Sequence, residues 1–440
     1  MNLPRRHFLS TLSLGGSAAL ASALRAQDTP TGDLPFGDLS KYSEAFVPIR
    51  AITKGPAFHW FAYYDKLQFD PTNRFVLSNQ VKFEHRTPTA DDRIHVGMID
   101  LEDGDRWIEL GKSDAWGWQQ GCMLQWIPGS KNEVLWNDRE GDRYVARIKN
   151  VETGETRTLP RAIYALSQDG KWGVTTDFAR LQALRPGYGY QGVADAWRTM
   201  KAPEKTGLWR VDLTTGEEKL IFSYAQAAAI PFKDGPLTDQ WNWFNHLLVA
   251  PGSQRFTFLH RWRAKGPDDA DFAVNNGFIT RMFTMNPDGS DPFIIDPSGH
   301  TSHFVWRDPR HITAWTRPEG QKDAFYLLED KTAKVTLVGE VDMPVNGHNT
   351  YLTVGNGMEW ILNDTYPTGV RRQQTPYLYH EPTKNRHDLG HFHSPKEYSG
   401  EWRCDTHPRS SNDGRFVTID SPHGGNGRQV WLLDVSGIVG

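Results

Sequence analysis

The chain has 440 residues, of which 38% are hydrophobic and 12% aromatic, and its formal net charge is −4. This composition allows one large repeat-built domain or two ordinary ones, and the near-balanced charge argues against a nucleic-acid partner. Only two cysteines, Cys122 and Cys404, are present, too few for a disulfide framework. Three alternatives are open for them: both are buried, they pair with each other, or Cys404 binds a metal.

The N-terminus has the pattern of a twin-arginine export signal. Arg5 and Arg6 precede Phe8, Leu9 and an apolar, small-residue run over residues 11–24. The run is too short to span a membrane, and no later segment approaches the required length. We predict a Tat-type signal over residues 1–26, cleaved after residue 23 or 26, and a linker over 27–43. The mature protein would lie in the periplasm or outside the cell, without a membrane association.

One pattern recurs seven times from residue 44 onward: an apolar strand, a turn rich in Gly, Pro and Asp, and a second apolar strand. The copies begin at Lys66, Cys122, Ile163, His246, His303, Thr350 and His407. Most continue into an outer hairpin, which makes four strands per copy. The sequence therefore predicts an all-β fold, a seven-bladed β-propeller over residues 44–440.

The last copy supplies only three strands, the third over residues 429–434. A fourth strand is available from residues 46–52, near the start of the predicted mature chain. We expect the N- and C-terminal strands to close one blade together, which removes an open sheet edge.

Four histidines are in phase with the repeat. His246, His303 and His407 each lie five residues before the turn of their copy, and His348 lies two residues earlier than that position. Since innermost strands line the channel, these imidazoles should converge near the axis. We predict that these four histidines form a metal or catalytic cluster, with Cys404 as a further candidate ligand; the metal would be Zn²⁺ or Mn²⁺, with Ca²⁺ as a third option. The alternative is that the histidines only satisfy buried strand ends.

Two further histidines end the second strands of their copies, each beside an arginine. His260 is followed by Arg261, and His85 by Arg86. A histidine with a pKa near 6.5 suits a general base, and an arginine can hold an anionic group. We therefore take His260 and His85 as catalytic candidates, with His246 and Arg261 binding substrate; the alternative is surface histidines at strand ends.

The longest interval between copies contains an insertion from residue 178 to about residue 204. Long insertions on such folds tend to be functional. Tyr188 is a third catalytic candidate, and Arg180, Arg185 and Tyr190 are candidates for binding an acidic sugar. The alternative is a loop ordered by aromatic packing. Two facing carboxylates of the glycosidase type, a nucleophile elbow and a nucleotide-binding loop are not evident.

The repeat copies resemble the oligogalacturonate lyases, seven-bladed propellers that cut uronic-acid chains, and more broadly the propeller lyases that include the ulvan lyases. The resembling segments contain His246, His260, His303, His348, His407 and His423. The resemblance implies that His303, His348 and His407 hold a metal that binds the substrate carboxylate, and that His260 removes the proton. This chain departs from the pattern at Val345, His348 and Thr350, where the pectate-oligomer enzymes have a closely spaced Gln and two His.

These observations together favour a lyase that cleaves an acidic polysaccharide or oligosaccharide by β-elimination. A metal or an arginine would neutralise the carboxylate, and a histidine or tyrosine would take the C5 proton. The second hypothesis is a TolB-like propeller without chemistry, which binds a protein or a glycan. A third is a glycoside hydrolase, which would need two carboxylates facing each other.

Overall fold

A computed structural model describes residues 39–440, except residues 62, 270–271, 273–276 and 356. The predicted signal and most of the predicted linker lie outside the described residues. Short strands make up most of the regular structure. The helices are η1 (Leu39–Tyr42), α1 (Phe178–Leu184), α2 (Tyr224–Ala229), η2 (Gly400–Trp402) and α3 (Ser436–Val439). Within these limits, no helix is long and apolar enough to cross a membrane.

The described residues form seven four-stranded antiparallel sheets. The first three, each taken in spatial order, are β3 (Phe58–Trp60), β4 (Phe75–Val81), β5 (Ile94–Asp100), β6 (Arg106–Ser113); β7 (Gln125–Trp126), β8 (Glu133–Glu140), β9 (Arg143–Asn150), β10 (Thr156–Leu159); and β11 (Ala165–Leu166), β12 (Trp172–Thr175), β13 (Gly207–Asp212), β14 (Glu218–Ser223).

The next two sheets are β15 (Trp241–Val249), β16 (Phe256–Arg263), β17 (Ile279–Met285), β18 (Phe293–Gly299), and β19 (Phe304–Asp308), β20 (His311–Thr316), β21 (Ala324–Glu329), β22 (Val335–Val338). The last two are β23 (Thr350–Tyr351), β24 (Trp360–Asn363), β26 (Tyr377–His380), β27 (Asn385–Asp388), and β29 (Arg409–Ser410), β30 (Phe416–Ser421), β31 (Gln429–Asp434), β2 (Ile49–Ala51). A small additional sheet contains β1 (Glu44–Ala45), β28 (Gly390–His393) and β25 (Gln373–Gln374).

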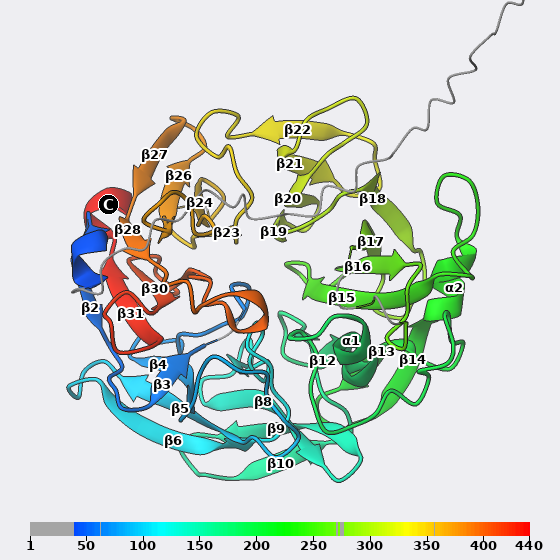
Figure 1. The fold of residues 1–440 in the computed structure, drawn as a ribbon, viewed down its shortest axis with the longest axis horizontal. Coiled ribbons are helices and arrows are strands. Elements are labelled where there is room, and N and C mark those ends of the chain that lie inside the picture. The colour runs from blue at the N-terminus through cyan, green and yellow to red at the C-terminus, as the bar shows by residue number, and fades with distance from the viewer. Residues whose placement is uncertain (1–38, 62, 270–271, 273–276, 356) are drawn as a thin grey trace, which may run out of the picture.

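The seven sheets stand in a ring around a common centre (Figure 1). The expectation of an all-β chain built from four-stranded units is confirmed. The N-terminal strand expected from residues 46–52 is present as β2, which pairs with β31 through Ile49 opposite Leu433 and Ala51 opposite Trp431.

Neighbouring sheets pack through apolar faces in which an aromatic residue of one sheet lies against a small residue of the next. Trp136 of β8 lies against Gly111 of β6, where an added Cβ would come within 2.7 Å of the indole. Because only glycine leaves room for the ring, the two sheets approach closely. Cys122 and Cys404 are both buried and unpaired with each other.

Two irregular segments leave the sheets and reach the centre. The insertion after β12 begins with α1, whose N-terminus is capped by Asp177 through the backbone N–H groups of Ala179 and Arg180. Figure 1 shows α1 on the inner side of its sheet. The second segment follows β3 and contains Tyr63 and Tyr64, which are both buried. These segments bring side chains from distant parts of the sequence to one place.

Candidate metal and catalytic site

Three histidines meet at the start of consecutive inner strands. His303 directly precedes β19, while His348 and His407 each lie two residues before β23 and β29. The rings of His303 and His348 have centroids 4.3 Å apart, and those of His348 and His407 are also 4.3 Å apart. The repeat phase thus brings these imidazoles together as expected. Burial, and then the charge of His348, lower the pKa of both His303 and His407, which favours the neutral form that binds metals.

Two of these histidines form a group with a carboxylate. Ligand atoms of His348, Asp405 and His407 lie within 4.8 Å of one another, and all three residues are buried. The Nε2 atoms of His348 and His407 and the Oδ1 atom of Asp405 have no hydrogen-bond partner. Burying a polar atom without a hydrogen-bond partner is unfavourable. Three such ligand atoms close together therefore fit a bound cation. Two imidazoles and one carboxylate suit Zn²⁺ or Mn²⁺.

Asp364 holds His348 in place through hydrogen bonds to its backbone and ring. Its carboxylate accepts hydrogen bonds from the backbone N–H of His348 at 2.8 Å, from the ring Nδ1 at 2.9 Å and from the Thr406 hydroxyl at 2.5 Å. Burial opposes charge on His348, but Asp364 raises the pKa of its ring. A carboxylate on Nδ1 leaves Nε2 directed toward the cation site, a common arrangement in metal centres.

The segment after β3 lines the same centre. The rings of Tyr63 and Tyr64 lie 5.4 Å and 6.3 Å from that of His407. His246 contacts Asp65 through Nε2 at 2.9 Å, and Lys66 lies 3.1 Å from the same carboxylate. Burial opposes ionisation of Asp65, but Lys66 and His246 lower its pKa to about 2. His246 is thus held by an ionised partner beside the metal-candidate histidines.

The insertion brings Tyr188 next to the metal candidates through one arginine. The guanidinium of Arg403 donates from Nε to Asp405 at 2.7 Å and from Nη2 to the Tyr188 hydroxyl at 2.8 Å. Burial alone would raise the pKa of Tyr188, but the charges of Arg403 and Arg185 lower it to about 7. A phenol that ionises near neutral pH is suited to proton abstraction.

His246 and His407 also have unusual backbones. Their φ angles are 49° and 38°, in the left-handed region that residues other than glycine seldom adopt. At His246 the strand pairing is irregular between Asn245 and Leu248. Such strain is concentrated at functional sites, because the surrounding structure must hold the side chain in place.

Three of the predicted site residues have structural partners instead. His260 is buried, and both its ring nitrogens are engaged, by Asn242 at 2.8 Å and by Arg281 at 3.1 Å. Arg180 donates to Asp195 and to four backbone carbonyls. The Tyr190 hydroxyl accepts from Asn137 at 2.9 Å. These bonds argue against His260 as a base and against Arg180 and Tyr190 as substrate contacts.

Two other predicted residues lie apart from the group. His85 is exposed and contacts the backbone of Glu397 and the ring of Tyr398. Cys404 is buried, and burial raises the pKa of its thiol, which opposes the thiolate needed for a metal ligand. Asp405, the next residue, takes the position expected for Cys404.

Asp405, Arg403, Asp364 and Tyr63 are further candidate site residues, which were not predicted from the sequence. Asp405 carried a signal, because residues 405 and 407 are two apart and share a side of an extended segment. Arg185 and Arg261, which were predicted, lie near this centre. Arg185 is one of the charges that lower the pKa of Tyr188, and the pKa of His246 is lowered mainly by burial, with a smaller contribution from Arg261.

Solved structures provide a comparison for this geometry. Oligogalacturonate lyase from Vibrio parahaemolyticus superposes with a TM-score of 0.62 at 17% sequence identity, over 90% of this chain and 98% of that one. The chain shares the fold of oligogalacturonate lyase. An oligogalacturonate lyase in complex with manganese gives a TM-score of 0.61 at 14% identity, over 89% of this chain and 94% of that one. Neither a protein-family model nor a curated protein sequence matches the chain.

Proposed function

We propose that the protein is a metal-assisted lyase that cleaves uronate-containing oligosaccharides or polysaccharides by β-elimination. The observation that carries the proposal is the Arg403 guanidinium, which joins a carboxylate of the candidate metal group to the hydroxyl of Tyr188. The same guanidinium thus contacts both a ligand of the candidate cation site and a candidate base whose pKa is lowered. The fold shared with oligogalacturonate lyase supports the same reaction class.

The metal would be held by His348, Asp405 and His407, where three buried ligand atoms have no other partner. A divalent cation there would supply positive charge for the C6 carboxylate of a uronate and so acidify its C5 proton. The manganese complex of the related fold supports a divalent metal of this kind.

Tyr188 is the proposed base. Arg403 stabilises its phenolate, which removes the C5 proton; the electron pair forms the C4–C5 double bond, and the C4–O4 bond breaks. The leaving O4 takes up a proton from the phenol that Tyr188 has become, or from water. Tyr366 lies 5.5 Å from the His348 ring, between ring centroids. Tyr63 and Tyr366 remain protonated because burial raises their pKa values, so they can line the site as neutral groups.

The test is the absorbance of the product. Elimination creates an unsaturated uronate, and the ultraviolet absorbance of a reaction with polygalacturonate oligomers, ulvan or glucuronan should rise with time. Chelation should stop the rise, and added Mn²⁺ or Zn²⁺ should restore it. If the metal-loaded protein leaves all three glycans unchanged, the proposal is wrong.

Two wider proposals accompany this one. The seven sheets would form a closed seven-bladed propeller, a view that the pairing of β2 with β31 supports. Export by the twin-arginine route would place the enzyme in the periplasm or outside the cell, where acidic glycans are met. Mass spectrometry of the periplasmic protein, with Arg5→Lys/Arg6→Lys as the control variant, tests the signal and its cleavage.

A further inference from the structure

Three arginines lie over the aromatic rings of Tyr188, Phe278 and Phe272. Arg185 follows α1, and its guanidinium carbon lies 4.5 Å from the ring centroids of both Tyr188 and Phe278. Arg261 of β16 lies 4.7 Å from the same Phe278 ring. Arg263, two residues further along β16, lies 4.1 Å from the ring of Phe272. We call Arg185, Arg261 and Arg263 the arginine cluster.

Apart from the Tyr188 phenolate beside Arg185, the described residues give the arginine cluster no counter-charge. Among the residues that the structure describes, none of the three forms an ion pair with a carboxylate, whereas the nearby Arg180 has Asp195 at 3.3 Å. Arg261 and Arg263 are 8% and 7% exposed. Burial, and then the charge of Arg185, lower the pKa of both side chains to about 10. Unpaired buried charges are unfavourable, so this arrangement calls for an anion from outside the chain.

The hydrogen-bonding groups point to the same kind of ligand. Nε of Arg185, Nε and Nη1 of Arg263 and Nε1 of Trp243 are buried and have no acceptor. Trp243 lies beneath Arg263, with its ring centroid 5.2 Å from the guanidinium carbon. All four nitrogens are donors, so a complementary group must offer several acceptor oxygens.

We propose that the arginine cluster binds a second anionic substituent of the glycan, next to the uronate whose carboxylate is held at His348, Asp405 and His407. The inference rests on the proposed function, because it takes the ligand to be an acidic glycan. Tyr188 connects the two places, with its hydroxyl on Arg403 and its ring on Arg185. The ligand group is an oxyanion, either the carboxylate of an adjacent uronate or a sulfate ester. The enzyme would therefore prefer chains that repeat negative charges over chains with a single one.

The test measures binding in a Tyr188→Phe background, where turnover is removed. Three probes are titrated calorimetrically: a saturated tetrauronate, its carboxyl-reduced neutral counterpart, and a neutral oligosaccharide bearing sulfate esters. Arg263→Gln should raise the Kd of at least one charged probe by about tenfold or more, since a charge-assisted hydrogen bond is lost. The Kd of that probe for Arg263→Lys should lie between the values for the parent and for Arg263→Gln, and the Kd of the neutral probe should be the same for all three proteins.

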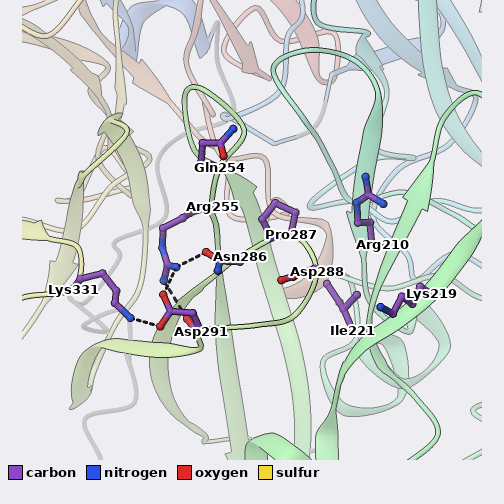
Figure 2. Close-up of a pocket in the computed structure, with 10 residues that line it drawn as sticks. All are labelled: Arg210, Lys219, Ile221, Gln254, Arg255, Asn286, Pro287, Asp288, Asp291 and Lys331. Atoms are coloured by element: carbon purple, nitrogen blue, oxygen red, sulfur yellow. Dashed lines mark hydrogen bonds and ion pairs between the residues drawn. The ribbon is translucent and has the colours of Figure 1, made fainter.

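The matched control is Arg210→Gln. It removes an arginine that lines the pocket in Figure 2 and is not part of the arginine cluster, so the Kd of each probe should not change. Arg185→Gln is the second variant should Arg263→Gln fold poorly, as judged by its melting temperature. If both charged probes bind folded cluster variants as tightly as the parent, or if neither binds the parent, the inference is overturned. Charge-dependent binding in this background, together with no unsaturated product from the metal-loaded protein that retains Tyr188, would defeat the lyase proposal alone and leave the anion site standing.

Discussion

Two regions of the molecule differ in how their charged groups are paired. Near the starts of β23 and β29, His348, Asp405 and His407 direct unpartnered ligand atoms toward one another in a buried space. A second region, which shares no residue with this group, is a pocket of about 640 Å³ lined by charged side chains from β13, β14 and the turns after β15, β17 and β21 (Figure 2). There Arg255 pairs with Asp330 at 2.6 Å and with Asp291 at 3.0 Å, and Lys331 also pairs with Asp291.

The two regions differ in whether their charged and polar groups already have partners on the chain. In the pocket of Figure 2, Arg255 and Lys331 already pair with carboxylates close to solvent, so these two charges leave little for a ligand to satisfy. In the centre, buried ligand atoms of the candidate metal group and guanidinium nitrogens of the arginine cluster have no hydrogen-bond partner. Substitutions in the central group should therefore alter metal content and activity, whereas matched substitutions elsewhere should not.

The largest effect is expected from a matched pair of carboxylate variants. Asp405→Asn removes a charged ligand, so bound metal should fall from near one equivalent to roughly a tenth or less, and lyase activity should disappear. Asp291→Asn, which also removes a carboxylate beside an arginine, should change neither. Elemental analysis of protein purified with Mn²⁺ or Zn²⁺ gives the answer. His407→Ala should repeat the loss, and full metal content in both central variants would rule out the site.

Tyr188→Phe should lower kcat by about 10²–10⁴-fold, the usual contribution of a general base, while metal content stays unchanged. Its control is Tyr190→Phe in the same insertion, since that hydroxyl only accepts a hydrogen bond from Asn137. Initial rates measured from product absorbance compare the two. Equal rates in both variants would contradict the assignment of Tyr188.

Asp364→Asn should weaken metal binding by about 10–100-fold, because Asp364 orients the His348 ring through Nδ1. The control is Asp308→Asn, which breaks a similar contact to His311 at 2.8 Å on the periphery. Competition with a chelator of known affinity measures both. Unchanged affinity in Asp364→Asn would mean that the carboxylate serves only the fold.

A smaller effect is expected from pH. The pKa of Tyr188 is lowered to about 7, and the phenolate is the active form of a base. The value of kcat/KM should therefore rise about tenfold per pH unit below 7 and level off above it. Arg403 and Arg185 favour the phenolate, while Asp405 opposes it, so Arg185→Gln should move the midpoint upward. A rate that declines from pH 6 to pH 8 would exclude this base.

Repeat phase was the part of the site that could be predicted from sequence. Turn chemistry and strand alternation set the seven copies, and counting back from each turn brought His303, His348 and His407 to one place. The same count could not separate Cys404 from Asp405, because the two are adjacent in sequence and only the folded chain shows which side chain lies within ligand distance of His348 and His407.

His260 and Tyr190 show the limit more clearly. Their residue types fit catalysis, but their roles depend on partners distant in sequence or on another strand, such as Arg281 for His260 and Asn137 for Tyr190. Arg403 was missed for the same reason: its importance comes from holding Tyr188, 215 positions away. Local patterns specify strands, whereas a site assembled between sheets depends on packing that single-sequence reasoning does not reach.

The pairing of β2 with β31 has a consequence for the timing of biosynthesis. Ile49 leaves the ribosome early, yet its partner Leu433 is made almost four hundred residues later. The candidate metal ligands and Arg403 also come from the final portion of the chain, so a nascent or truncated polypeptide would have Tyr188 without its activating partners. Cleavage chemistry would thus be withheld during synthesis and begin only when the ring has both its first and its last strand.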